Sequence, residues 1–282
     1  MHHLETPFML TSKPTVNLIA DSVNTVGDRL TTFEVKYWRP LLPEMNTHRV
    51  FSRNAASSRA QSFDARCKNI IQGNICVPEH WNAEQPGMVG GEEFSDDIKK
   101  VINERIQILA RNVTSELMAL NLWVKQATGN EIHKQYLNRY IEPFCQVTQL
   151  ISSTTWDNFL NLRTADDAQP EIRDVAYLIL DALINHKPVE RKLHLPYITD
   201  KEFAEYGEET AKKISVARCA RVSYKAYAGE GDLERDMRLF ERLKKNGHLS
   251  PFEHVAMADP EAFWPEDHKN YKGWFQYRSL FE

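Results

Sequence analysis

The sequence lacks an apolar run long enough to cross a bilayer, and its N-terminus lacks the apolar segment of a secretory signal. It also has little net charge, because 35 Lys and Arg stand against 39 Asp and Glu, which gives −4 at pH 7. A protein that coats nucleic acid is usually basic overall, so this balance disfavours that role. We therefore expect a cytoplasmic protein that binds neither membranes nor nucleic acid.

Cysteine is scarce as well, and its spacing fits neither a metal site nor a disulfide framework. The four residues are Cys67, Cys76, Cys145 and Cys219. We interpret them as reduced thiols, mostly buried, and we expect no metal ion. The chain has no internal repeat and no clear linker, so residues 1–282 are predicted to form a single domain with a sizeable core.

One stretch concentrates the positive charge that the chain lacks overall. Residues 47–59 contain three arginines, a histidine and three serines, and they contain no acid. Guanidinium groups, hydroxyls and backbone N–H groups all donate hydrogen bonds to anionic oxygens. An isolated run of this kind is often only a solvated loop, so the rest of the chain must decide between a loop and a binding site for a small anion.

Periodicity predicts a strand and several helices. Residues 31–38 alternate apolar and polar, which is typical of a half-buried strand. A helix is expected to begin near residues 54–57 and to continue to Asn69, placing a helix N-terminus within the donor-rich stretch. Residues 94–120 show helical spacing and are expected to be core scaffold.

Further helices are predicted from their terminal signals. Pro170 near the first position of a helix precedes a buried face at helical spacing. Thr199 and Glu202 form a capping-box pattern, and residues 233–243 form an amphipathic helix that Asn246 and Gly247 end. The aromatic residues of the C-terminal tail are interpreted as core or subunit interface rather than as a platform for folate.

Four separated segments together resemble the flavin-dependent thymidylate synthases. That family's signature is an Arg-His-Arg triplet followed by Ser, Asn-Glu, Ser and Arg at fixed intervals. At those intervals this chain has His48-Arg49, Ser52, Asn54, Ser57 and Arg59. The other three segments are residues 158–172, Ala220-Arg221-Val222-Ser223, and residues 247–254, Gly-His-Leu-Ser-Pro-Phe-Glu-His.

The order of these segments differs from that of common family members. There, the Ala-Arg-Val-Ser and Gly-His-x-x-Pro-Phe-Glu-His segments precede the signature, whereas here they come last. The chain therefore resembles a circularly permuted branch often found in bacterial viruses, in which case it would act in the host cytoplasm. Such a permutation requires only that the original termini lie close together at the surface.

The resemblance implies an α/β (α+β) fold with a central sheet and long flanking helices, assembled as a homotetramer that converts dUMP to dTMP. Methylenetetrahydrofolate would supply the one-carbon unit, and FAD reduced by NADPH would supply the hydride, so the protein mainly orients its ligands. At the flavin the resemblance places His48, Arg49, Ser52, Asn54, Asn158, Ser223, Ser250 and Glu253. At the nucleotide it places Ser57, Ser58, Arg59, Arg139 and Arg163. Of these, Arg49 and Arg163 are expected to take part in catalysis.

Each assignment has a structural alternative. His48 could be a structural histidine, Asn158 a helix cap, and Arg163 a surface partner of Asp166 or Asp167. Ser223 and Ser250 could serve only as turn or cap residues.

Three positions depart from the family pattern: Thr47 replaces the first arginine of the triplet, Ala55 the signature glutamate, and Asp167 a histidine. Loss of a carboxylate near the base could change which pyrimidine is bound, because mismatched buried polar groups go unpaired. The alternatives are therefore a dCMP-type methylase, a pyrimidine nucleotide hydroxymethylase, and a non-catalytic nucleotide-binding homologue.

Overall fold

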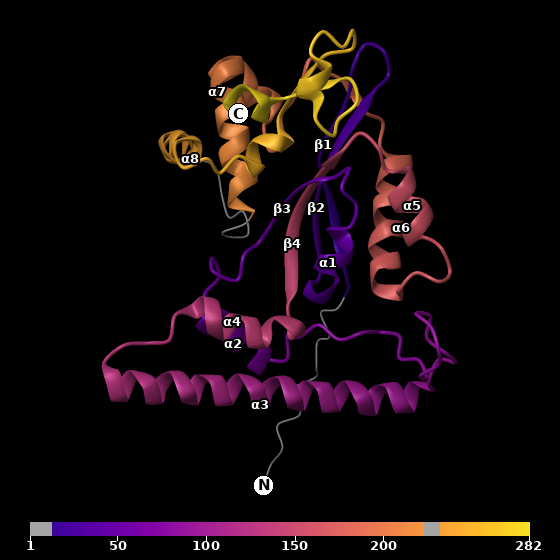
Figure 1. The fold of residues 1–282 in the computed structure, drawn as a ribbon, viewed down its shortest axis with the longest axis vertical. Coiled ribbons are helices and arrows are strands. Elements are labelled where there is room, and N and C mark those ends of the chain that lie inside the picture. Colours follow the sequence, from indigo (N-terminus) through magenta and orange to yellow (C-terminus); the bar gives the residue numbers. More distant parts are fainter. Residues whose placement is uncertain (1–12, 223–231) are drawn as a thin grey trace.

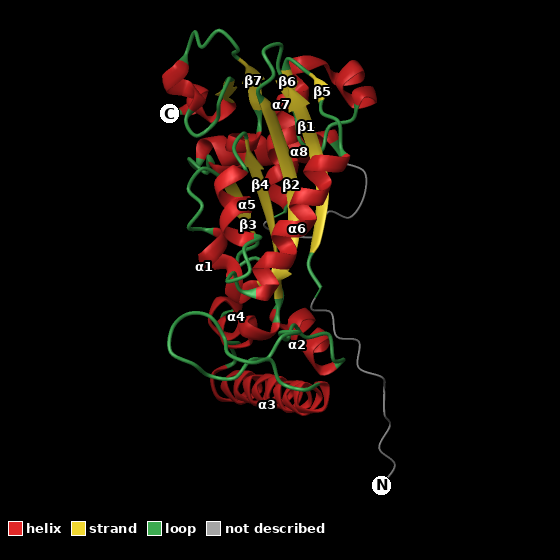
Figure 2. Ribbon diagram, turned by 90° about the vertical axis from the view of Figure 1, so that its right-hand side faces the viewer, coloured by secondary structure: helices red, strands yellow, loops and turns green. Residues whose placement is uncertain are grey.

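The fold is built around a sheet of five strands in the order β3-β4-β2-β1-β5 (Figures 1 and 2). The structure is a computed structural model that describes residues 13–222 and 232–282. Its strands are β1 (Thr15–Val23), β2 (Arg29–Trp38), β3 (Ser52–Ala55), β4 (Gln146–Ser153) and β5 (Val189–Glu190). All neighbours are antiparallel except β1 and β5. β3 therefore forms one edge of the sheet, and β1 with the short β5 forms the other.

β2 lies at the centre because it is buried on both faces. Phe33, Val35 and Tyr37 point to one face and are at most 1% exposed, as the alternation predicted. Thr32 on the opposite face is also fully buried, so the strand is more deeply enclosed than a half-buried strand. Pairing with β4 in the register Phe33↔Ile151 places two fully buried side chains opposite each other.

Helices α5 (Asp157–Arg163) and α6 (Pro170–Asn185) cover the first face of the sheet. α6 begins at the predicted proline, and its residues Ile172, Val175 and Ile179 are fully buried where the helix packs on β1 and β2. This layer forms the largest apolar cluster, because β-sheet and helix each bury one apolar face there.

The second face is covered by α7 (Asp200–Arg221) with a small sheet beside it, and α8 (Leu233–Lys245) packs on α7. The small sheet consists of β6 (Leu193–His194), β7 (Ala256–Ala258) and β8 (Trp274–Gln276). α7 begins with the predicted capping box of Thr199 and Glu202. α8 is followed by Gly247 at φ +65, which confirms the predicted stop because only glycine adopts that conformation without strain.

A third layer lies at one end of the sheet, where α3 (Asp96–Thr128) crosses below α2 (Phe63–Ile71) and α4 (Lys134–Ile141) (Figure 1). The expectation that α3 is core scaffold was wrong. Only Gln107, Ala110 and Thr114 of its 33 residues are buried, whereas Val101 and Trp123 are 55% and 64% exposed. The spacing predicted the helix correctly, but periodicity does not distinguish an apolar face that is buried in the core from one that is exposed.

Short helical segments complete the chain: η1 (Arg39–Leu41), α1 (Leu42–Met45), η2 (Glu142–Phe144), η3 (Ser250–His254), η4 (Pro265–His268) and η5 (Tyr277–Phe281). In the C-terminal tail, Tyr271, Trp274 and Tyr277 are at most 5% exposed, which confirms that these aromatic residues belong to the core. The whole is a mixed α/β fold, as predicted. In the described part of the chain, no helix combines the length and apolar character needed to span a membrane.

Candidate functional site

The donor-rich stretch forms an edge strand rather than the start of a helix. β3 pairs with β4 in the register Ser52↔Ser152 to Ala55↔Gln149, so its backbone groups are used in the sheet. The helix begins only at Phe63, after Ser62 has capped its N-terminus through the backbone N–H of Ala65. The predicted helix start at residues 54–57 was therefore wrong, because pairing with a strand about a hundred residues away overrides the local preference.

η3 packs directly on β3. The signature stretch and the Pro-Phe-Glu-His segment therefore meet in space although about 200 residues separate them in the chain. Asn54 strengthens the junction by donating a side-chain hydrogen bond to the carbonyl of Cys219 in α7, at 2.8 Å. Three of the four resembling segments thus converge around β3.

His48 is bound to Arg163 at the start of this stretch. Arg163 Nε donates to His48 Nε2 at 3.0 Å, and Arg163 Nη1 lies 3.4 Å from the carboxylate of Glu44. Burial, together with the positive charges of Arg163 and Arg53, lowers the pKa of His48 to about 4. His48 is therefore a neutral acceptor near neutral pH, not the cationic donor that the resemblance suggested.

Arginines nevertheless dominate the charge around His48. Arg49 is exposed, and Arg53 donates to the carbonyl of Met45 at 3.2 Å. Burial lowers the pKa of Arg53 below its ordinary value, while the charge of Glu253 opposes that shift. Sequence analysis overlooked Arg53, although it lies within the signature stretch. The cluster offers more guanidinium donors than carboxylates, which suits an anionic ligand.

Thr47 explains how the missing first arginine is accommodated. Its hydroxyl donates to the carbonyl of Glu44 at 2.7 Å and closes the turn after α1. The side chain therefore stabilises the local backbone instead of adding a cation to the site.

Ser52 lies in a buried polar cluster with the C-terminal tail. It is 1% exposed, and it accepts hydrogen bonds from Asn270 Nδ2 and Gln276 Nε2, both at 3.1 Å. These two tail residues could not be identified from the sequence, since they lie more than 200 positions from Ser52 and belong to no quoted motif. Ser52 is consequently a structural centre of the site rather than a freely exposed ligand group.

Glu253 is held beside this cluster by Arg278, which donates to its carboxylate. The Tyr271 hydroxyl donates to the backbone carbonyl of Glu253 at 2.8 Å. Burial raises the pKa of Glu253 above its ordinary value, although Arg278 counteracts the shift. Arg278 is a further residue that sequence analysis did not identify.

Four of the five residues expected at the nucleotide lie at the other end of β3, whereas the fifth, Arg163, lies beside His48. Ser57, Arg59 and Arg139 are all exposed. Asn138 Nδ2 donates to the carbonyl of Ser58 at 2.8 Å and thereby ties the loop after β3 to α4. Arg59 follows Ser58 and Arg139 follows Asn138, so this hydrogen bond places the two arginines on adjoining segments.

Ser58 does not join that exposed pair. It is 7% exposed, and its hydroxyl donates to the carboxylate of Glu142. Glu142 also pairs with Arg39 at 3.1 Å and with Arg66 at 3.5 Å. The Ser58 hydroxyl is therefore engaged inside the protein, because it donates to a partly buried carboxylate that two guanidinium groups also contact. Its exposed neighbours Ser57 and Arg59 remain the candidate ligands.

Several other predicted residues lie apart from these contacts. Asn158 in α5 and Ser250 at the start of η3 are exposed, and Ser223 lies outside the described residues. Asp167 is exposed after α5, and Arg163 pairs with Glu44 rather than with Asp166 or Asp167. Within residues 13–222 and 232–282, no group of three or more His, Cys, Asp or Glu side chains could hold a metal ion.

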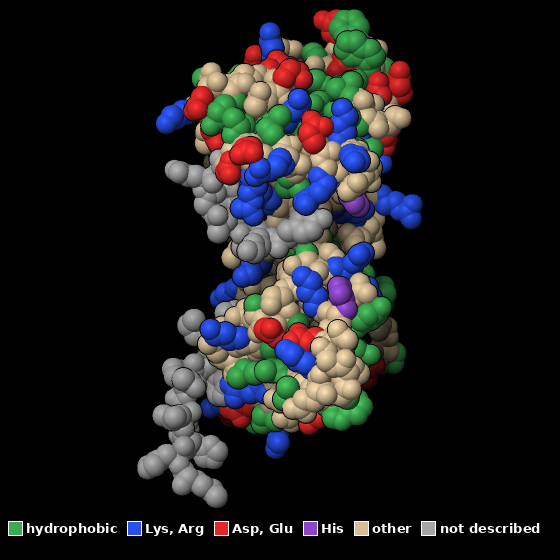
Figure 3. Space-filling model, turned by 90° about the vertical axis from the view of Figure 1, so that its left-hand side faces the viewer, with side chains coloured by type: hydrophobic (Ala, Val, Ile, Leu, Met, Phe, Trp, Pro, Cys, Tyr) green, Lys and Arg blue, Asp and Glu red, His purple; other side chains and the backbone are tan. Residues whose placement is uncertain are grey.

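The surface around these segments is basic. Figure 3 shows one face of the molecule, on which Lys and Arg side chains gather on both sides of a waist. Clustering of one sign of charge in a narrowed region attracts anionic ligands even when the whole molecule is mildly acidic.

Comparison with known proteins assigns the family. The model described as Thy1, thymidylate synthase complementing protein, matches residues 29–189. A flavin-dependent thymidylate synthase from Thermotoga neapolitana is 41% identical over 61 residues, which cover 22% of this chain and 27% of the relative. The match thus spans about a quarter of that relative's length.

Two solved structures are similar at low identity. The first is the UMP/dUMP methylase PolB from Streptomyces cacaoi bound with 5-Br UMP, which is 16% identical with a TM-score of 0.48, over 63% of this chain and 92% of that one. The second is ThyX from Helicobacter pylori with FAD and dUMP, which is 18% identical with a TM-score of 0.37, over 55% and 67%. The family model covers more than half of the chain, so the protein belongs to the Thy1 family, that of the flavin-dependent thymidylate synthases.

Proposed function

We propose that this protein methylates dUMP to dTMP with methylenetetrahydrofolate as the one-carbon donor and with FAD that NADPH reduces. The observation that carries the proposal is that two groups of hydrogen-bond donors lie at the two ends of β3. Arg49, Arg53 and Arg163 surround its beginning, and Arg59 with Arg139 lies beyond its end. Two separate anionic ligands can be bound in this way, one on each side of the strand.

The residues at the beginning of β3 fit a flavin dinucleotide. Its diphosphate needs several cationic donors, and the guanidinium groups there outnumber the neighbouring carboxylates. We assign Arg49 and Arg53 to the diphosphate, with Arg163 held in place by His48 and Glu44. Bound FAD would supply hydride chemistry, which no side chain of the protein can perform.

Tritium release tests the reaction. Purified protein should be yellow, and it should release tritium from 5-tritiated dUMP when methylenetetrahydrofolate and NADPH are present. Release from 5-tritiated dCMP but not from dUMP would contradict the proposed substrate.

The two-ligand assignment has its own test. Arg59→Ala should weaken dUMP binding by about 1.5–3 kcal/mol, the usual contribution of a charged hydrogen bond, and should change flavin retention little. The exposed Arg242→Ala in α8 serves as the matched control and should affect neither ligand. If Arg59→Ala loses flavin and keeps its affinity for dUMP, the two halves of the site are reversed.

Ala55 favours a second candidate. It lies at the end of β3, where the family has a glutamate beside the base, and its methyl group cannot bond an exocyclic amine or carbonyl. A pyrimidine nucleotide hydroxymethylase, or a methylase that acts on dCMP, is therefore the alternative. Mass spectrometry separates the hydroxymethyl product by one additional oxygen, and independence from NADPH would support it.

We also infer a homotetramer, for which α3 supplies the supporting surface. A helix advances about 100° per residue, so Ile98, Val101, Leu109, Leu120 and Trp123 fall along one stripe. All five are at least 46% exposed, and the stripe lies opposite the face that packs on α2 and α4. Contiguous apolar exposure of this kind is typical of a subunit interface.

The permuted segment order remains a proposal too. In support, Asn24 donates to the carbonyl of Gly273 at 3.0 Å, and Trp274 donates to that of Asp28 at 3.0 Å. The C-terminal tail therefore contacts the turn before β2, the strand that follows the Pro-Phe-Glu-His segment in the common order.

A further inference from the structure

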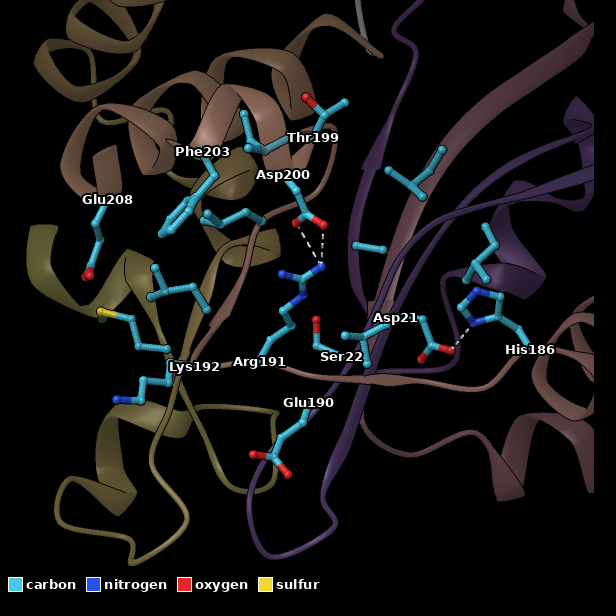
Figure 4. A pocket seen from close by; sticks show the side chains of 18 residues that line it. Asp21, Ser22, His186, Glu190, Arg191, Lys192, Thr199, Asp200, Phe203 and Glu208 are labelled. Atoms are coloured by element: carbon cyan, nitrogen blue, oxygen red, sulfur yellow. Dashed lines mark hydrogen bonds and ion pairs between the residues drawn. The ribbon is translucent and has the colours of Figure 1, made fainter. Parts of the chain in front are cut away.

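A cavity of about 690 Å³ lies at the edge of the sheet opposite β3 (Figure 4). It is bounded by β1, by the connection that contains β5 and β6, and by the first part of α7. Its volume falls in the range of sites for small organic ligands. Of its lining residues only His186 and Val189 fall within residues 29–189, so the family match does not account for it.

Half of the lining is apolar and is only partly covered by the protein. Phe203 of α7 faces the cavity (Figure 4). Leu18 of β1, Met257 of β7 and Leu195, which follows β6, also line it. Phe203 is 38% exposed and Val189 is 47% exposed, which is high for large apolar side chains beside a concave surface. A ligand that removes this area from water must have an apolar body.

Most acids that line the cavity are already neutralised. The buried carboxylate of Asp21 is 2.7 Å from Arg29, and Glu208 is 3.0 Å from Lys212. Asp200 is 2.8 Å from Arg191. Among the described residues that line the cavity, Glu190 is the one acid without an ion pair. The lining acids therefore have little capacity left to bind a cation.

The bases keep more of their hydrogen-bonding capacity. Arg191 and Lys192 are consecutive and exposed, and Arg191 uses one nitrogen, Nη2, for Asp200. That pair is weak, because its side chains are 44% and 78% exposed and water screens them. Three ammonium donors and the remaining guanidinium donors are therefore available at the rim of the cavity to a ligand anion.

We propose that this cavity is a second binding site, for a small molecule with a flat apolar body and one carboxylate. The body covers Phe203 and its apolar neighbours, and the carboxylate bonds to the guanidinium of Arg191, while Lys192 adds a positive charge elsewhere on the rim (Figure 4). A single guanidinium with one neighbouring ammonium suits a monoanion. Because the cavity lies at the far edge of the sheet, it does not overlap the residues assigned to flavin and nucleotide.

Binding of 2-naphthoate to the purified full-length protein, measured by isothermal titration calorimetry, tests the proposal. The control ligand is 2-naphthylmethylamine, which has the same rings but carries a positive charge in place of the carboxylate. We expect the carboxylate to bind at least tenfold more tightly than the amine. Equal or tighter binding of the amine, or no binding of 2-naphthoate at millimolar concentration, would overturn the proposal.

Variants locate the binding site. Arg191→Ala and Lys192→Ala should each weaken 2-naphthoate binding at least fivefold, whereas Lys187→Ala, an exposed lysine of the same connection outside the cavity, should change it less than twofold. Asp200→Asn should tighten binding, because it removes the carboxylate that competes for Arg191. Unchanged binding by both Arg191→Ala and Lys192→Ala, with circular dichroism confirming their fold, would refute the site. The readout needs neither flavin nor nucleotide, so it is independent of the proposed methylase activity.

Discussion

His48 shows how a family residue can have an unexpected protonation state. Burial and two arginines lower its pKa from 6.5 to about 4, so the folded protein keeps it neutral where an unfolded chain would protonate it. The unfolded state therefore binds more protons between these two values, and stability is lost as the pH falls through that window. The same direction holds for the buried His194 and His254, whose pKa values burial lowers to about 3.

His48→Gln tests this assignment, since a glutamine oxygen can still accept from Arg163 but does not titrate. Between pH 7.5 and pH 5 wild-type protein should lose about 2 kcal/mol more unfolding free energy than the variant, the value that follows from the shift. Urea denaturation at both pH values measures the difference. His248→Gln, which changes an exposed imidazole, is the control. Equal pH dependence in wild type and His48→Gln would contradict a neutral, buried His48.

Sequence and resemblance placed His48, Arg49, Ser52 and Asn54 in one region, because these residues lie within one stretch. Sequence and resemblance could not identify the residues that these side chains contact. Arg163 binds His48, 115 positions away, and not the nearby aspartates that local spacing offered. A side chain's partner depends on tertiary packing, which the residue's own neighbours in the sequence do not encode.

At the scale of elements, local signals predicted the helices that carry their own caps. α6 has its proline, α7 its capping box and α8 its glycine stop, and each begins or ends as expected. β3 lacked such a signal. Its strand conformation depends on β4, and the expected helix gave way to that pairing.

Glu142 joins three elements, because it binds Arg39 of η1, Arg66 of α2 and the loop serine Ser58. Glu142→Ala would leave two guanidinium groups buried without their carboxylate, which costs about 3–5 kcal/mol. The unfolding free energy from urea titration should fall by that amount. Glu131→Ala, which breaks an exposed pair with Lys125, should cost less than about 1 kcal/mol. A similar loss in the two variants would show that the Glu142 cluster is solvated.

A chain of buried hydrogen bonds crosses the second face of the sheet. Ser22 contacts His194 at 2.9 Å, His194 contacts Thr32 at 2.7 Å, and Thr32 contacts Ser152 at 2.5 Å. Ser152 in turn lies 2.8 Å from His254 Nδ1 in η3. Strands β1, β2 and β4 are thus joined to the segment that carries Glu253.

Ser152→Ala should therefore destabilise the protein by about 1–3 kcal/mol, because it leaves His254 Nδ1 buried without a partner. Thermal unfolding followed by circular dichroism measures the change. Thr15→Ala at the exposed start of β1 is the control and should shift the midpoint much less. If Ser152→Ala is as stable as wild type, water replaces the hydroxyl and the chain of bonds is not needed.

For the whole molecule, the feature that matters most is the apolar stripe of α3. A helix of 33 residues is about 50 Å long, and one face of it packs on α2 and α4 while the apolar stripe stays exposed in the described chain. Val101→Glu with Trp123→Glu places two charges on the stripe and should dissociate the assembly to monomers in size-exclusion chromatography with light scattering. Glu104→Lys and Lys100→Glu exchange charges on the same helix and should leave the assembly intact. Because α3 contacts α2 and α4 through its opposite face, the monomeric variant should keep its helical circular dichroism. A wild-type protein that is already monomeric would refute the interface, and with it the proposed tetramer.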